Sequence, residues 1–291
     1  MTDNGITVVA EGLGFPEGPV VMADGSVIVV EISGRTIARC WGSGRVERVA
    51  QCGGGPNGAA IGPDGALYVC NNGGLPIGIF GNKEAPESGR IERVDLNTGK
   101  TERLYDSCGG VPLSAPNDLV FDASGGFWFT DLGRITDGAH EFGGLYYALP
   151  DGKRITRVHR GVSSYNGVGL SPDGATVYVA ETFSARLYAY QAKPEPRYQR
   201  RLVGTAPGLV ELDSLAVTAA GNICVAQLHE GGITSFTPDG VTQTTPTPDP
   251  YTTNIAFGGA DMCTAWITLS TTGRLIKRQW AEAGLKLHFN G

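Results

Sequence analysis

The chain repeats one pattern of apolar and polar positions six times. In each copy a polar residue introduces an apolar strand, a turn follows, and a second apolar strand leads back to another polar residue. The introducing residues, which we call launch residues, are Glu17, Asn57, Asn117, Asn166, Asp213 and Asn254. Eight residues after the first five stand the turn glycines Gly25, Gly65, Gly125, Gly174 and Gly221. Copies spaced by 40 to 60 residues indicate the blades of a propeller rather than a short-repeat solenoid or a parallel α/β sheet.

Each copy has room for four strands, the usual number in a propeller blade. Small residues such as Gly58, Ala59 and Ala60 follow the launch residue, as expected of an innermost strand where blades converge. The pattern therefore predicts an all-β fold, a six-bladed β-propeller of four-stranded antiparallel blades. One domain over residues 1–291 accounts for the whole chain.

Closing the ring requires the two ends of the chain to meet, because an open blade edge leaves backbone groups unpaired. Ile6 to Glu11 precedes Glu17 just as Arg45 to Gln51 precedes Asn57. We therefore expect the N-terminal strand to be the outer strand of the last blade. Residues 284 to 290 compete for that place.

Charge and cysteine content narrow the partners. The net charge is −6 and Lys and Arg do not cluster, which argues against nucleic acid or an anionic membrane and favours a cation or a small molecule. The six cysteines are scattered without metal-binding spacing, which predicts free thiols in a reducing compartment. The first ten residues lack a signal-peptide pattern and no stretch of 18 apolar residues occurs, so we expect a cytoplasmic protein.

The second strand of each copy ends at a polar residue, here called the return residue. Because a strand and its antiparallel partner of similar length end on the same face, launch and return residues should surround one mouth of the channel. The return residues are Glu31, Asn71, Asp131, Glu181, Gln227 and Ser270. The carboxylates expected around this opening are those of Glu17, Glu31, Asp118, Asp131, Glu181 and Asp213.

So many buried carboxylates cannot all stay ionised and unpaired, and a divalent cation would resolve the conflict. Oxygen ligands without Cys or His among the launch residues favour Ca²⁺, then Mg²⁺ or Mn²⁺, with Zn²⁺ or Fe²⁺ less suited. The alternative is that these side chains only cap strand ends and line a wet channel.

Four segments in register resemble the regucalcin/gluconolactonase family of six-bladed propellers, over essentially the whole chain. They are Phe15 to Pro19, Pro116 to Asp118, Asn166-Gly167 with Ser171 to Gly174, and Leu212 to Leu215. The resemblance implies metal-dependent hydrolysis of sugar-acid lactones at the channel mouth. It implies Glu17, Asn166 and Asp213 as metal ligands, and Asn117 as a contact to substrate or metal.

Asp213 would by resemblance also be the general base for the attacking water. A metal-bound Asp should be a weak base, so Asp131 or Asp118 are alternative bases. Asn57 and Asn71 are further candidates for contact with the substrate.

The chain departs from the animal members of the family at Ala115, where they carry an Arg, so their sugar contacts cannot be carried over. Two long loops follow return residues and are candidates for lids: Gly73 to Gly89 and Leu132 to Gly143. Arg134 could replace the missing cation, and His229 lies on the mouth side, where it could contact substrate.

Two other readings stay open. One is a non-enzymatic calcium-binding or regulatory propeller, because the fold alone does not fix the function. The other keeps the fold and changes the chemistry, as in an organophosphate hydrolase or a strictosidine-synthase-like condensing enzyme.

Overall fold

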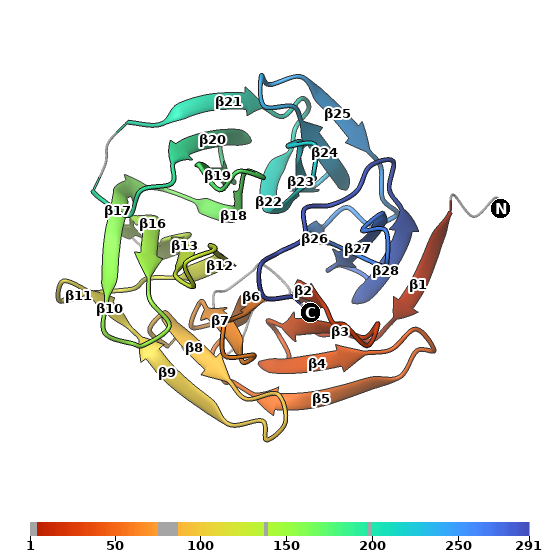
Figure 1. Ribbon diagram of the computed structural model, residues 1–291, viewed down its shortest axis with the longest axis horizontal. Helices are drawn as coiled ribbons and strands as arrows, with labels where there is room; N and C mark the ends of the chain where they lie inside the picture. The colour runs from red at the N-terminus through yellow and green to blue at the C-terminus, as the bar shows by residue number, and fades with distance from the viewer. Residues whose placement is uncertain (1–4, 75–86, 137–138, 197–198, 291) are drawn as a thin grey trace.

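Six four-stranded sheets stand around a central axis like the blades of a propeller (Figure 1). The computed structural model describes residues 5–74, 87–136, 139–196 and 199–290. Every regular element within these ranges is a strand. The described ranges contain no helix long and apolar enough to cross a lipid bilayer. The all-β six-bladed prediction is confirmed.

The blades follow the chain order, from the innermost strand outward. Blade 1 comprises β2 (Pro16–Val21), β3 (Val27–Glu31), β4 (Thr36–Cys40) and β5 (Val46–Gln51). Blade 2 comprises β6 (Pro56–Ile61), β7 (Leu67–Asn71), β8 (Arg90–Val94) and β9 (Thr101–Tyr105). Blade 3 comprises β12 (Pro116–Phe121), β13 (Phe127–Asp131), β16 (Gly143–Ala148) and β17 (Ile155–Val162).

The second half continues the same order. Blade 4 comprises β18 (Tyr165–Leu170), β19 (Thr176–Glu181), β20 (Arg186–Gln191) and β21 (Arg201–Thr205). Blade 5 comprises β22 (Glu211–Val217), β23 (Ile223–Leu228), β24 (Gly232–Phe236) and β25 (Thr242–Thr245). Blade 6 comprises β26 (Thr252–Gly258), β27 (Thr264–Leu269), β28 (Arg274–Gln279) and β1 (Ile6–Ala10).

The N-terminal strand β1 pairs antiparallel with β28 and so closes the ring, as predicted. Residues 284–290 do not take this place. Gly284 forms a bridge to Thr218, and Lys286 and Asn290 line a cavity on the axis. The last blade is therefore built from both ends of the chain, which holds the toroid shut.

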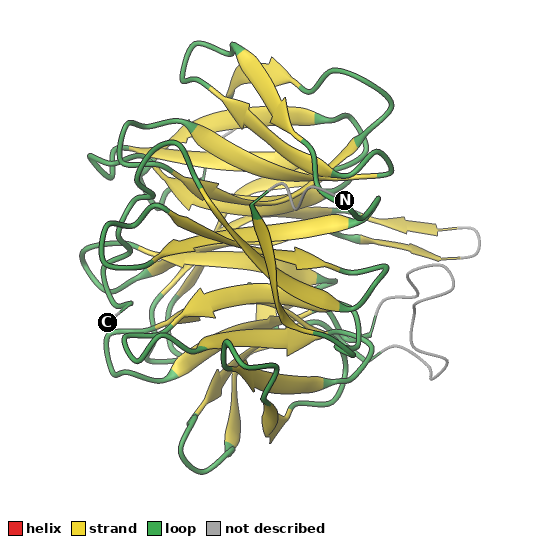
Figure 2. Cartoon of the chain, turned by 90° about the vertical axis from the view of Figure 1, so that its right-hand side faces the viewer, coloured by secondary structure: helices red, strands yellow, loops and turns green. Residues whose placement is uncertain are grey.

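Two short hairpins are added to this plan. One pairs β10 (Ser107–Cys108) with β11 (Val111–Pro112), and the other pairs β14 (Arg134–Thr136) with β15 (Ala139–Glu141). The β14–β15 hairpin projects from one face of the molecule, whereas the C-terminus lies at the opposite face (Figure 2). Of the two lid candidates, the second contains this hairpin. Most of the first, residues 75–86, lies outside the described residues.

The core lies between neighbouring blades. The second strand of a blade is buried on both faces, as Val27–Glu31 illustrates, while an outer strand such as Val46–Gln51 is largely exposed. Aromatic rings fill the space between blades 2 and 3, where Tyr68 meets Phe121 edge to face at 5.0 Å. All six cysteines are free, as expected, and four of them are buried apolar residues of this core.

The inner strands approach one another closely. Each carries a register irregularity next to its launch residue, and such bulges re-aim side chains. A Cβ on Gly58 would lie 2.5 Å from the carbonyl oxygen of Asn117 in the next blade. One on Gly167 would lie 2.8 Å from the carbonyl oxygen of Asp213. Glycine after a launch residue therefore lets the next launch residue come alongside.

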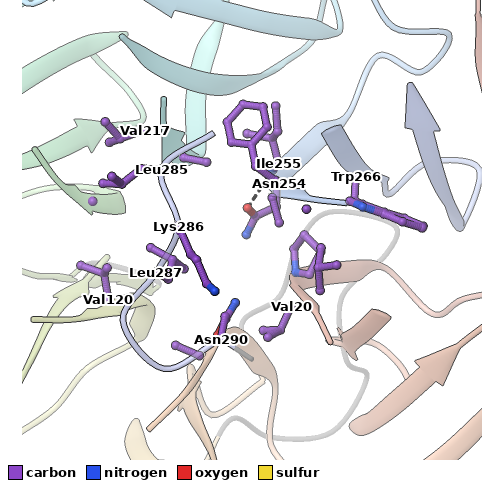
Figure 3. A pocket seen from close by; sticks show the side chains of 18 of the residues that line it. Val20, Val120, Val217, Asn254, Ile255, Trp266, Leu285, Lys286, Leu287 and Asn290 are labelled. Atoms are coloured by element: carbon purple, nitrogen blue, oxygen red, sulfur yellow. Dashed lines mark hydrogen bonds between the residues drawn. The ribbon is translucent and has the colours of Figure 1, made fainter. Parts of the chain in front are cut away.

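A cavity of about 620 Å³ occupies the axis towards the face that carries the C-terminus. Inner-strand residues such as Val20, Val120 and Ile255 form its apolar wall (Figure 3). Lys286 and Asn290 reach into it from the C-terminal segment. This end of the axis is thus mostly apolar.

Gly58→Ala should destabilise the protein by about 2 kcal/mol, because the added methyl group meets backbone that cannot move away. Thermal unfolding of the two proteins would measure this. Gly42→Ala is the matched control, since a Cβ there has no neighbour within 4 Å. Equal melting temperatures for Gly58→Ala and Gly42→Ala would contradict the close approach of the inner strands.

Candidate functional site

A pocket of about 290 Å³ opens at the launch end of the axis, on the side of the β14–β15 hairpin. Five of the six launch residues line it: Glu17, Asn57, Asn117, Asn166 and Asp213. They start five different blades, and the bulges beside them direct their side chains to one place. The expected meeting of launch residues at one mouth is therefore observed.

The two carboxylates of this set are buried. Glu17 is 2% exposed and accepts hydrogen bonds from Asn254 Nδ2 and from the Gly18 N–H, each at 2.8 Å. Asn254, the sixth launch residue, thus positions Glu17. Asp213 is 7% exposed and is hydrogen-bonded to Asn166.

The amide of Asn166 is held by two hydroxyl groups. Its Nδ2 donates to Thr182 Oγ1 at 3.2 Å, and its Oδ1 accepts from Ser214 Oγ at 3.4 Å. Asn117 differs, because its Oδ1 is buried and has no hydrogen-bond partner in the described part of the chain. A buried oxygen without a partner costs about 1–3 kcal/mol, which points to a ligand that would satisfy it.

Burial raises the pKa of both carboxyl groups. Desolvation, followed by repulsion from Asp213, places the pKa of Glu17 well above its ordinary value. Desolvation also raises the pKa of Asp213, to about 8. The site therefore holds negative charge only at a free-energy cost, which a bound cation would remove.

The prediction that six carboxylates surround one opening is wrong, because the return residues turn into their blades. Glu31 accepts from Gly14 N and Thr36 Oγ1 and pairs with Arg48 at 3.0 Å. Glu181 accepts from Ser184 Oγ. Within the described chain, only Glu17 and Asp213 bring carboxylates to the pocket lining.

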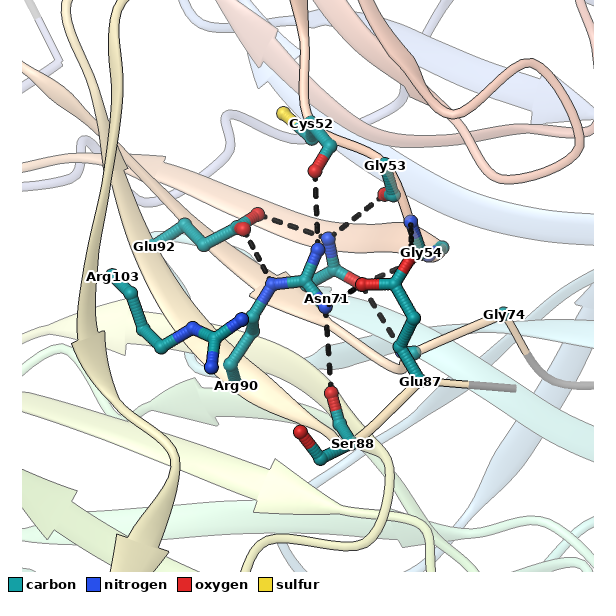
Figure 4. A network of polar contacts seen from close by, with 12 residues as sticks. Cys52, Gly53, Gly54, Asn71, Gly74, Glu87, Ser88, Arg90, Glu92 and Arg103 are labelled. Atoms are coloured by element: carbon teal, nitrogen blue, oxygen red, sulfur yellow. Dashed lines mark hydrogen bonds and ion pairs between the residues drawn. The ribbon is translucent and has the colours of Figure 1, made fainter. Parts of the chain in front are cut away.

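Asn71 shows the same behaviour. It was expected to contact substrate, but its side chain bonds Gly55 N, Gly73 N and Glu92 instead (Figure 4). Arg90, which is 3% exposed, completes this network with Glu92 at 2.5 Å and Glu87 at 2.9 Å. Asn71 thus fixes the loop that leads into β6 and does not line the pocket.

The residue after five of the six return residues lines the pocket instead. Successive side chains of a strand point to opposite faces. When a return residue points into its blade, the next residue therefore points towards the mouth of the channel. The residues so placed are Ile32, Asn72, Leu132, Thr182 and Leu228. Sequence reasoning missed these residues. They could have been identified from their position, because each directly follows a return residue.

The three candidates for a general base lie in different places. Asp213 lines the pocket. Asp118 lines the axial cavity, where burial raises its pKa to about 7. Asp131 accepts from the N–H groups of Ser114, Ala115 and Gly133 and lies outside the pocket lining, so its oxygens serve the backbone.

Arg134 lines the pocket as anticipated, and one terminal nitrogen of its guanidinium donates to three backbone carbonyls. These belong to Asn72, Glu87 and Ser114, at 3.0 to 3.1 Å. Arg134 therefore joins the hairpin to blade 2. His229 lies beside the pocket, not in its lining, with Nε2 3.2 Å from Glu211.

The chemistry of the donor set fits a hard divalent cation. Two carboxylates and the amide oxygens of Asn166 and Asn117 converge, and one of those oxygens lacks a partner. No three His, Cys, Asp or Glu side chains group in a metal-binding arrangement in the described ranges. The set depends on asparagine oxygens, which suit Ca²⁺ better than softer metals.

Fold and site together define a six-bladed propeller with an acid and amide pocket on its axis. The model of the SMP-30/gluconolactonase/LRE-like region matches residues 15–271, and the chain belongs to this family. The resemblance noted in the sequence is thereby confirmed.

Named relatives share part of the sequence. The lactonase drp35 of Staphylococcus haemolyticus is 32% identical over 187 residues, 62% of this chain and 53% of the relative. The gluconolactonase of Zymomonas mobilis is 27% identical over 268 residues, 81% of this chain and 70% of the relative. The chain spans about half the length of the drp35 relatives that it matches.

Solved structures agree in fold. A gluconolactonase from Xanthomonas campestris superposes with a TM-score of 0.78 at 23% identity, covering 94% of this chain and 89% of that one. A calcium-binding protein, regucalcin, from Agrobacterium tumefaciens has a TM-score of 0.74 at 20% identity, covering 97% and 99%. At these identities the likeness supports the fold alone.

Asp213→Asn should change how stability depends on pH in metal-free protein. With its pKa raised from 3.8 to about 8, Asp213 binds its proton more tightly in the folded state than in the unfolded chain. Its contribution is thus fully present below about pH 4 and is lost as pH rises through 8. In chelator, denaturant unfolding should show the variant clearly more stable than wild type at pH 8.5 and nearly equal to it at pH 4. A pH-independent difference would contradict the raised pKa.

Arg90→Met should destabilise the protein by about 3 kcal/mol or more, because it leaves the Glu92 carboxylate buried without its positively charged partner. Arg93→Met is the control, since its pair with Asp64 is partly exposed and should contribute less than about 1 kcal/mol. Urea unfolding at pH 7 measures both. Similar losses in the two variants would show that the network around Asn71 has no special weight.

Proposed function

We propose that the protein is a metal-dependent hydrolase that opens a lactone, a cyclic ester, at the launch end of its axis. The observation that supports this best is the meeting of Glu17, Asp213 and Asn166 with the unpartnered oxygen of Asn117 in one pocket. Membership of the family and relatives named lactonase and gluconolactonase support the same reaction.

In this proposal Glu17, Asn166 and Asp213 hold one divalent cation, and we assign Ca²⁺ because all donors are oxygens. When bound, such a cation polarises the lactone carbonyl and stabilises the negative charge that develops on its oxygen. Asn254 and Thr182 act as positioning residues, since they fix Glu17 and Asn166 through hydrogen bonds.

The remaining chemistry falls to residues of the pocket. Asn117 and Asn57 orient the lactone on the floor. A water oxygen bonds to the carbonyl carbon while its proton passes to the Asp213 carboxylate. The bond from that carbon to the ring oxygen then breaks, and the ring oxygen takes the proton to leave a hydroxy acid. Of the three candidate bases, we choose Asp213 because it lines the pocket, whereas Asp118 and Asp131 do not, and this position outweighs the loss of basicity that the bound cation causes.

The partner that this proposal requires is a small molecule, which a concave pocket of this size can enclose. We place the protein in the cytoplasm, because six free cysteines are typical of a reducing compartment.

A second candidate is a calcium-binding propeller without catalysis. The structural relative described as a calcium-binding protein, regucalcin, favours it, and the same oxygens would serve. The two candidates differ in whether the bound ion supports turnover.

Removal and return of metal separates the two candidates. Chelated protein should lose lactone hydrolysis, followed as acid release at constant pH, and Ca²⁺ should restore it. Asp213→Ala and Asn166→Ala should lower kcat/KM at least about 100-fold. Asp106→Ala, in a partly exposed residue outside the pocket lining, is the control and should retain full activity. Stoichiometric Ca²⁺ binding without turnover on any lactone would favour the calcium-binding candidate.

A further inference from the structure

The pocket has two chemically different zones. Its floor carries the launch residues, whereas its wall comes from segments that follow the second strands of several blades and is mixed, with Asn72, Thr182 and Arg134 among its residues. The apolar part of this wall consists of Ile32, Leu132, Ile135, Phe183 and Leu228. The polar floor suits the ester group of a substrate, whereas the apolar part of the wall suits an apolar group.

Two of the apolar side chains that line the pocket are largely exposed to solvent. Ile135 on the β14–β15 hairpin is 60% exposed, and Phe183 after β19 is 51% exposed. Large apolar side chains exposed at the rim of a pocket are typical of sites that bury an apolar part of a ligand. Ile135 and Phe183 come from different blades and line the same pocket.

The positively charged side chain of the pocket lining, Arg134, is anchored to the backbone. One terminal nitrogen of Arg134 donates to three backbone carbonyls, and its Nε is buried without a hydrogen-bond partner in the described part of the chain. It therefore serves to hold the hairpin, and with it Ile135, in place. A polyhydroxylated lactone would have to turn some of its hydroxyl groups against the apolar wall, where they would lose water without gaining partners.

We infer that the substrate is a lactone that carries an apolar alkyl or aryl substituent, with the ring on the polar floor and the substituent against Ile135 and Phe183. This inference rests on the proposed function and specifies its substrate class. A volume of about 290 Å³ leaves room for a ring with a short substituent.

The test compares three lactones on the Ca²⁺-loaded protein: a γ-butyrolactone with a pentyl chain, γ-butyrolactone itself, and glucono-δ-lactone. We expect the highest kcat/KM for the pentyl lactone. Ile135→Ser and Phe183→Ser should each lower it about tenfold, while γ-butyrolactone stays within about twofold. Unchanged γ-butyrolactone turnover also shows that the variants fold. Leu209→Ser, in a residue 85% exposed and outside the lining, is the matched control.

Faster turnover of glucono-δ-lactone, or equal losses on both γ-lactones, would overturn the inference. The corresponding pentyl γ-lactam is an amide analogue that resists hydrolysis. Its binding, measured by calorimetry, distinguishes failure of the substrate inference from failure of the proposed lactonase function. Lactam binding weakened about tenfold by Ile135→Ser, without turnover of any lactone, would support apolar recognition and reject the lactonase. Equal binding of the pentyl and unsubstituted lactams would reject the apolar site whatever the turnover.

Discussion

The close approach of six inner strands at the axis is the constraint on which the structure depends. Blades converge there, and three of the launch residues are followed by glycine, of which Gly58 and Gly167 sit against the backbone of the next blade. The bulge in each inner strand then directs the launch side chain to the mouth. Polar groups from five blades meet because the packing of the ring leaves them that position.

This meeting places two carboxylates in a site that cannot hold their charge cheaply. Burial and mutual repulsion raise the pKa of Glu17, and burial raises that of Asp213. Asn254 and Asn166 relieve part of the cost by hydrogen bonds. A bound cation would remove the rest of the free-energy cost of burying these ionised carboxylates. Folding stability, metal affinity and the proposed chemistry therefore depend on the same few atoms.

The return residues do the opposite work. Glu31, Asn71 and Asp131 accept hydrogen bonds from the loop that leads into the inner strand of their own blade. They fix where each launch residue stands, while their successors form the pocket wall. Adjacent positions of the same strands therefore supply both the positioning of the floor and part of the pocket wall. The floor suits a reaction, and the wall suits the choice of substrate.

The sequence by itself determined the repeat, the six blades, the closing strand and the launch residues, because turns eight residues on and apolar strands depend on local spacing. It also singled out Glu17, Asn117, Asn166 and Asp213. Only the tertiary structure decided that Asn71 and Asp131 face into their blades while Ile32, Leu132 and Phe183 face the pocket. Side chains alternate along a strand, so the sequence does not decide whether a polar residue at its end points into the blade or into the pocket. That direction is set by the neighbouring backbone groups that need a hydrogen-bond partner, which only the tertiary structure brings together.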